Sequence, residues 1–127
     1  MLQVLLIGMV VFMFSKLASY NTENNEVDKI VKETHKYSGI YPRLYRTFQA
    51  NMTLATEYMK EEKFNRSQTA LVNAVNNLND IGHYMILTDV DLIDEIAEIG
   101  DRLGITFERI LMQKSLIKGE NYRPKYI

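Results

Sequence analysis

The first twenty residues contain the feature that most restricts what this chain can fold into. Residues 2–14 read LQVLLIGMVVFMF, with Gln3 as the only polar side chain, and residues 15–20 continue this apolar character more weakly. As an α-helix, twenty residues rise about 30 Å, close to the thickness of a bilayer's hydrocarbon core. The sequence therefore predicts a membrane anchor helix at 1–20. The side chains expected to contact lipid are Leu2, Val4, Leu5, Leu6, Ile7, Val10, Val11, Phe12 and Phe14.

Two other interpretations of this segment compete with the anchor. A cleaved signal peptide needs a basic start and small residues before the cleavage site, whereas Leu2 follows Met1 directly and no A-x-A pattern is present. A buried core helix is compatible with so short an apolar run. Such a helix in a small domain needs a polar face, which residues 2–14 lack. Both comparisons favour an uncleaved anchor.

Lysines after the apolar run indicate the orientation of that anchor. Lys16, Lys29, Lys32 and Lys36 follow the span, and only the amino terminus precedes it. The positive-inside rule then places the C-terminal body on the cytoplasmic side of the membrane. The localisation predicted is thus a single-pass membrane protein.

The rest of the chain is patterned as helix. Only six glycines and two prolines are present, which leaves little material for the tight turns of an all-β fold. We expect a juxtamembrane linker and short helix at 21–41, a helical bundle at 42–118 and an extended tail at 119–127. The fold class predicted is all-α, with the membrane helix followed by a small antiparallel bundle.

Helix boundaries and buried faces follow from capping signals and periodicity. Asn25 is placed to cap the short helix, which should end at Ser38, and Pro42 suits the first turn of the next. That helix should run from Pro42 to Glu62, a third should start near Asn65 or Ser67, and Thr88 with Asp91 resembles a capping box for a fourth. Apolar residues at helical spacing predict these core stripes: Leu44, Tyr45, Phe48, Met52, Ala55 and Met59; Leu71, Val75, Leu78, Ile81 and Met85; Leu92, Ile96, Ile99, Leu103, Phe107, Ile110, Leu111 and Ile117.

Residues suited to catalysis or metal binding are few. The chain has no cysteine and only two histidines, and Asp80 with His83 forms just a two-residue pair where a structural metal site needs more ligands. The acidic residues at 89–95 lack the glycine and glutamate spacing of a calcium loop. We therefore expect no metal, no cofactor and no enzymatic activity.

Two groups of residues are candidates for contacts with a protein partner. Tyr41, Arg43, Tyr45 and Arg46 interleave aromatic and basic side chains, a pattern that single-strand nucleic-acid binders also use. A net charge of −1 does not suggest nucleic-acid binding, so we expect protein contact and no nucleic acid. The second group lies in the tail, which is too short to add much core. It is either a frayed terminus or an arm that docks on a neighbour through Tyr122, Arg123 and Tyr126.

The order of these parts resembles that of small single-span minor capsid proteins of large icosahedral double-stranded DNA viruses with an internal membrane. The stretches that carry the resemblance are LQVLLIGMVVFMF at 2–14 and YPRLYRTFQANM at 41–52. It implies a structural link between a capsid shell and the underlying virion membrane, with membrane lipid and capsid subunits as partners. Single-span accessory subunits of respiratory or other membrane complexes share the layout and are the alternative. A mitochondrial targeting segment would be Arg-rich and amphipathic, which residues 1–20 are not.

Overall fold

A computed structural model describes residues 26–85 and 90–127 of the chain. These residues form helices, turns and a C-terminal tail, with no strand among them, so the all-α prediction is confirmed for this part of the protein. The segment 26–33 is helical and continues into a short 3₁₀ helix. The elements are η1 (Thr34–Tyr37), α2 (Pro42–Lys60), α3 (Phe64–Met85) and α4 (Val90–Lys118).

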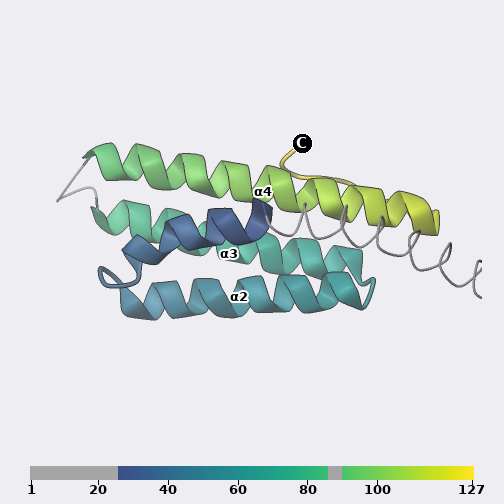
Figure 1. Ribbon diagram of the computed structural model, residues 1–127, viewed down its shortest axis with the longest axis horizontal. Coiled ribbons are helices and arrows are strands. Elements are labelled where there is room, and N and C mark those ends of the chain that lie inside the picture. The colour runs from purple at the N-terminus through teal and green to yellow at the C-terminus, as the bar shows by residue number, and fades with distance from the viewer. Residues whose placement is uncertain (1–25, 86–89) are drawn as a thin grey trace, which may run out of the picture.

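The three long helices run alternately up and down, and the segment 26–37 completes a bundle with a short first member (Figure 1). α3 packs against α2 on one side and α4 on the other. The segment 26–37 bridges the two outer helices. The Thr34 hydroxyl lies 3.1 Å from the Tyr45 hydroxyl of α2, and Lys36 forms an ion pair with Glu95 of α4.

The turn between α2 and α3 depends on one residue in the left-handed region. Glu62 has a φ of 62°, which is uncommon for a residue other than glycine. The Glu61 amide still bonds to the Glu57 carbonyl, and the Lys63 amide reaches back to the Tyr58 carbonyl at 2.8 Å. α2 therefore ends at Lys60, slightly before the predicted boundary, and α3 begins at Phe64.

The predicted stripes meet in one continuous core. Most of their described members are buried, and Leu44 is half-buried at the margin. The largest fully buried side chains are Tyr37, Phe48, Phe107, Met59, Leu71, Leu78, Ile81, Ile96, Ile99, Leu103 and Leu111. Ser67 is also buried, and its hydroxyl donates to the Ala55 carbonyl of α2 at 2.6 Å. This bond satisfies a polar group where an unpaired hydroxyl would be costly.

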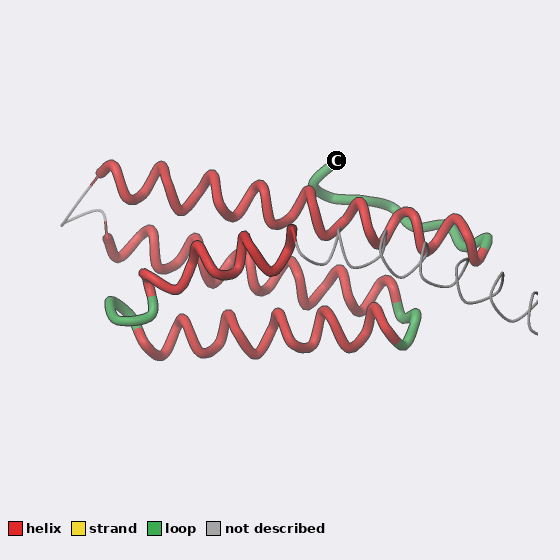
Figure 2. Tube along the Cα trace, in the orientation of Figure 1, coloured by secondary structure: helices red, strands yellow, loops and turns green. Residues whose placement is uncertain are grey.

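Ile117 is the exception among the predicted core residues, because 86% of its surface is exposed. The last turn of α4 extends beyond the turn that joins α2 to α3, as the tube view shows (Figure 2). No other helix of the described bundle extends that far, so the helical spacing of Ile117 does not bury it. The prediction of a core position for Ile117 was wrong.

The chain reverses direction after α4. Gly119 adopts a φ of 71°, and the Glu120 amide bonds to the Ser115 carbonyl at 3.0 Å, an arrangement that ends a helix and satisfies its last carbonyls. Residues 120–127 then run back along α4 without helical structure (Figure 2). The prediction of an extended tail at 119–127 agrees with this path.

None of the helices at 26–85 and 90–127 has the length and apolar character needed to cross a bilayer. The predicted anchor at 1–20 lies outside the described residues and stays a prediction. The same holds for Thr88 of the predicted capping box and for the side chains of Met85 and Leu92.

Candidate partner-binding surface

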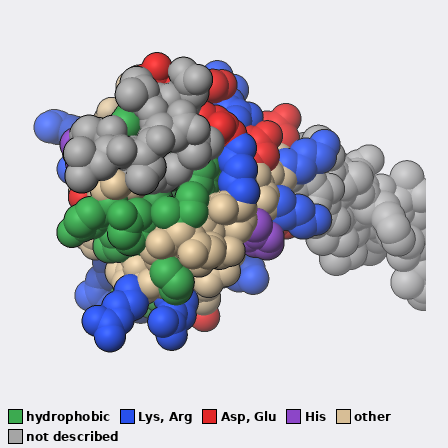
Figure 3. Space-filling view, turned by 90° about the vertical axis from the view of Figure 1, so that its left-hand side faces the viewer, with side chains coloured by type: hydrophobic (Ala, Val, Ile, Leu, Met, Phe, Trp, Pro, Cys, Tyr) green, Lys and Arg blue, Asp and Glu red, His purple; other side chains and the backbone are tan. Residues whose placement is uncertain are grey.

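An apolar and aromatic surface covers the end of the bundle where the segment 26–37 turns into α2. We call it the Tyr84 patch and define it as Ile40, Tyr41, Leu44 and Tyr84. Tyr84 is 58% exposed and Ile40 is 44% exposed, while Tyr41 and Leu44 are half-buried. Figure 3 views this end of the bundle and shows hydrophobic side chains gathered on the surface with Lys and Arg side chains beside them.

Local backbone structure holds the patch together. The Ile40 amide bonds to the Tyr37 carbonyl at 3.2 Å, which closes the turn after η1. Tyr41 is the N-cap of α2 and Pro42 occupies its first turn, as the sequence predicted for Pro42. The rings of Tyr41 and Tyr84 are 5.0 Å apart between centroids, and the Tyr41 hydroxyl donates to the Tyr84 carbonyl at 3.4 Å. Residues far apart in the sequence thus form one surface.

Two arginines border the patch. Arg43 and Arg46 are exposed on the first turns of α2, where no acidic residue is present. The Arg46 Nε donates to the Pro42 carbonyl at 3.3 Å, and within the described part of the chain Arg43 has no acidic partner. Tyr41, Pro42, Leu44 and both arginines line a shallow hollow of about 390 Å³. A half-buried tyrosine and two exposed arginines around a hollow match residue types that are enriched at protein interfaces.

Tyr45 does not belong to this surface, although the sequence grouped it with Tyr41, Arg43 and Arg46. It is 3% exposed. Its ring packs against Phe48 at 5.6 Å between centroids, and its hydroxyl pairs with Thr34. Tyr45 is therefore a core residue, and its candidacy as a partner contact is corrected.

The C-terminal tail is held by a buried carboxylate that the sequence did not single out. Glu108 of α4 is 0% exposed. The backbone amide of Lys125 donates to both its oxygens, at 2.9 and 2.8 Å. Gln68 of α3 donates to Glu108 at 3.2 Å and to the Arg123 carbonyl at 2.7 Å. Because these hydrogen bonds are made to backbone atoms of residues 123 and 125, they hold the tail against α3 and α4, and the tail is part of the folded bundle.

Two tyrosines of the tail pack beside Glu108. The ring of Tyr126 lies directly over Gly104, where a Cβ atom would be 2.6 Å from the ring. The Tyr122 hydroxyl is buried near Glu108 and Gln68 without reaching hydrogen-bonding geometry to either. Burial above all, and then the negative charge of Glu108, raise the pKa of Tyr122 well above its ordinary value.

The tail is therefore not a frayed terminus, because it packs on its own chain. Its docking on a neighbour stays a prediction. Tyr122 and Tyr126 are half-buried against their own chain, and only the side chain of Arg123 among the three predicted contact residues is exposed. The expectation that the tail adds little to its own fold is corrected. A glycine inside a helix, such as Gly104, is compatible with close packing of a neighbour, but nothing in the sequence assigns Tyr126 as the residue that fills the space.

The residues weighed for metal binding do not converge. Asp80 and His83 are both exposed near the end of α3, and Glu95 is paired with Lys36. Among residues 26–85 and 90–127, no group of three or more histidine or acidic side chains is placed to hold a metal ion. Asp89, which precedes α4, lies outside the described residues, and so does the side chain of Asp91.

Comparison with known proteins adds no relative: no protein-family model matches the chain, and neither a curated protein nor a solved structure matches it significantly.

Proposed function

We propose that this protein is a non-enzymatic structural protein, anchored in a membrane by residues 2–14, whose bundle binds a larger assembly through the Tyr84 patch. The observation that carries the proposal is the exposure of Ile40 and Tyr84 on one end of the bundle. Burying each of them against a well-packed partner would contribute about 1–2 kcal/mol. Arg43 and Arg46 add donors that can pair with acidic groups of that partner.

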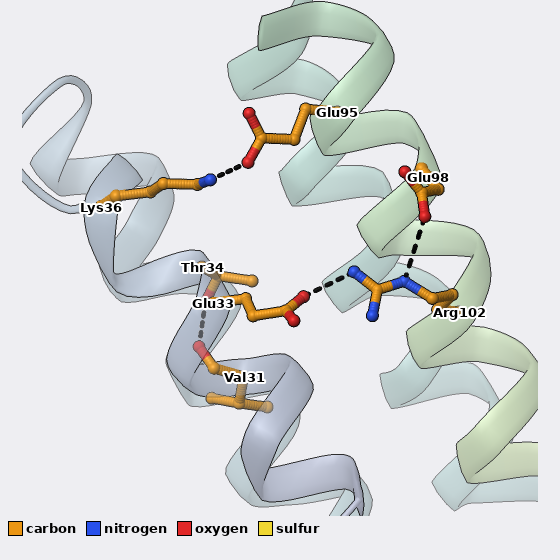
Figure 4. A network of polar contacts seen from close by, with 7 residues as sticks. All are labelled: Val31, Glu33, Thr34, Lys36, Glu95, Glu98 and Arg102. Carbon is orange, nitrogen blue, oxygen red and sulfur yellow. Dashed lines mark hydrogen bonds and ion pairs between the residues drawn. The ribbon is translucent and has the colours of Figure 1, made fainter.

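The direction of the segment 26–37 relative to the Tyr84 patch also supports a linking role. Along the segment 26–37, Lys36 pairs with Glu95, and Glu33 pairs with Arg102 at 2.5 Å (Figure 4). The segment therefore runs antiparallel to α4, and its N-terminal end points away from the Tyr84 patch. A partner on the patch would therefore lie at the far end of this segment from residue 26, the residue that the predicted anchor precedes in the sequence.

Within this proposal, the preferred assembly is a viral capsid shell bound to its internal membrane, with the body on the cytoplasmic side during assembly. The apolar start at 2–14 and the stretch at 41–52 support it, because the second stretch contributes Tyr41, Leu44 and both arginines to the surface. The alternative is an accessory subunit of a respiratory or other membrane complex, which would use the same two parts.

Membrane attachment is tested by fractionation. The full chain should remain in the membrane pellet after an alkaline carbonate wash, and a variant lacking residues 2–14 should move to the soluble fraction. Mass spectrometry of purified virions and of cellular membranes from the source then separates the capsid from the accessory-subunit assignment. A full chain that the carbonate wash releases would refute the anchor.

The patch is tested by introducing charge into its apolar surface. The proposal expects the full chain to migrate in a large complex on native electrophoresis after mild detergent extraction, and Ile40→Asp and Tyr84→Asp should each remove it from that complex. Leu54→Asp is the matched control and should stay in the complex, because Leu54 is 41% exposed on α2 and lies outside the patch. If the patch variants are retained in the complex, the assignment of the patch fails.

A further inference from the structure

The end of the bundle opposite the Tyr84 patch exposes a second apolar surface of a different chemical kind. Ile117 is 86% exposed and Leu116 is 73% exposed, which makes them the two most exposed large hydrophobic side chains of the described residues. They occupy the last turn of α4, which overhangs the turn between α2 and α3 (Figure 1). The tail does not cover them, because it reverses at Gly119 and returns along α4.

Lysines occur next to these two aliphatic side chains in the sequence and at the turn that the end of α4 contacts. Lys118 follows Ile117 directly, and Lys60 and Lys63 lie at the α2–α3 turn. Glutamates are interleaved with them: Lys118 pairs with Glu62, and Lys63 pairs with Glu61 at 3.2 Å. The surface is thus aliphatic with a lysine-rich, nearly neutral rim, whereas the Tyr84 patch combines tyrosine with arginine.

This chemistry favours a lipid surface as the occupant. Lysine is depleted at protein interfaces, where tyrosine and arginine are enriched. At a membrane surface, by contrast, aliphatic side chains enter the boundary between headgroups and acyl chains while lysines extend toward the headgroups. Pairing of the lysines with glutamates weakens their attraction to headgroups but does not prevent membrane binding, because burial of the aliphatic side chains supplies part of the binding strength.

The direction of the chain also points to the membrane at this end. The pairs Lys36–Glu95 and Glu33–Arg102 show that lower residue numbers in the segment 26–37 lie beside higher numbers in α4. Val27 and Asp28 line a hollow of about 380 Å³ together with α2 residues from Gln49 to Lys60, most of which belong to the C-terminal half of α2. The start of the segment 26–37 is therefore its end nearer to Leu116 and Ile117, and the predicted anchor precedes that start in the sequence.

We propose that the last turn of α4 rests on the membrane that holds the anchor, with Leu116 and Ile117 inserted at the headgroup–acyl boundary. This inference depends on the proposed membrane attachment of residues 2–14. It adds that the bundle stands on the bilayer by a defined end, with the Tyr84 patch directed away from the lipid.

The chain has no tryptophan, so a single introduced tryptophan reports on its own position. Ile117→Trp in the full chain, reconstituted into vesicles of phosphatidylcholine and phosphatidylglycerol, should be quenched about twofold or more by lipids brominated on the upper acyl chain, since interfacial side chains enter about 5–10 Å. Tyr84→Trp, at the opposite end, is the matched control and should show almost no quenching. The double variant Leu116→Ser with Ile117→Trp should reduce the quenching, because it removes the neighbouring aliphatic anchor.

The absence of cysteine provides a second, independent measurement. In the same vesicles, Ile117→Cys labelled with a small environment-sensitive fluorophore should emit at shorter wavelength than Tyr84→Cys carrying the same label.

Three outcomes would overturn the inference, and each identifies which part of it is wrong. If the tryptophan of the Ile117→Trp variant is not quenched while the chain resists carbonate extraction, the anchor stands and the membrane contact of α4 is refuted. If the Ile117→Cys variant instead cross-links to a second copy or to another protein, that protein covers the surface and the lipid contact is wrong. If the chain is released by carbonate, both the anchor and the inference fail.

Discussion

The substitution Gly104→Ala tests whether the C-terminal tail is part of the folded bundle. An added Cβ would lie 2.6, 2.7 and 2.8 Å from three atoms of the Tyr126 ring. Contacts this short are not tolerated, so either the ring or α4 must move. α4 is fixed by the core, whereas Tyr126 belongs to a tail with no helical structure. The tail is therefore expected to lift from α4.

The cost follows from the contacts that the tail makes. Lifting it breaks the bonds from the Lys125 amide to the buried Glu108 carboxylate, and hydrogen bonds to a charged group are worth about 1.5–3 kcal/mol. Exposing the half-buried Tyr126 ring costs about 1 kcal/mol more. Alanine in place of glycine within a helix restores about 1 kcal/mol. The free energy of unfolding should thus fall by about 1.5–3 kcal/mol.

A double-mutant cycle with Tyr126→Ala gives the sharpest form of this prediction. Without the Tyr126 ring, the effect of Gly104→Ala on the free energy of unfolding should change sign. The substitution should then stabilise the chain by about 1 kcal/mol, because only the helix-propensity effect is left. Gly100→Ala is a second control, since its Cβ would lie 3.4 Å from the Val75 side chain, an ordinary contact. The measurement is denaturant unfolding followed by circular dichroism, on the full chain in mild detergent.

The result that would refute the reasoning is a stabilising Gly104→Ala in the wild-type background. The tail would then move away at no cost, and the hydrogen bonds of Glu108 would not contribute to stability. Equal effects in the presence and absence of Tyr126 would lead to the same conclusion.

Three further predictions concern buried and exposed polar groups. The thermal midpoint of unfolding should decline as pH rises above about 10, the ordinary pKa of tyrosine. The reason is that Tyr122 keeps its proton in the folded state while the unfolded chain releases it. In Tyr122→Phe this decline should be smaller. Tyr37→Phe should leave the chain as stable or make it up to about 1 kcal/mol more stable, because the Tyr37 hydroxyl is buried without a partner; a loss above about 1 kcal/mol in denaturant titration would show an unrecognised bond. Arg102→Ala should cost less than about 1 kcal/mol despite its pairing with Glu33, because both side chains are more than 40% exposed, and added salt should reduce the difference from wild type.

Periodicity predicted the core of this protein well, because an apolar stripe at helical spacing must be buried wherever another helix lies opposite. Phe48, Leu78 and Leu103 follow that rule and are fully buried. Ile117 breaks it for a physical reason: spacing identifies a face of α4, but it does not show where the neighbouring helices end. Tyr45 illustrates the opposite error: it was predicted as a surface contact because it lies near two arginines, although its spacing also placed it on the buried stripe.

The candidate sites were predicted less completely. Tyr41 and Arg43 were identified from their residue types, but Ile40 and Tyr84 join them only through the packing of η1 and α3 at one end of the bundle. Glu108 was missed because a carboxylate on a helix is expected to face water. Its burial becomes tolerable only when the Lys125 amide, which is 17 residues away, folds back onto it.

α4 has one more consequence, which follows from its length. It is a single helix of 29 residues from Val90 to Lys118, and at about 1.5 Å per residue it measures about 43 Å. If one end stands on lipid and the Tyr84 patch binds at the other, the bundle is a rigid spacer that sets the gap between membrane and assembly. Lengthening α4 within the part that packs on α3 would break its register with α3, so most of that gap is fixed by the packed helices together and not by a flexible tether.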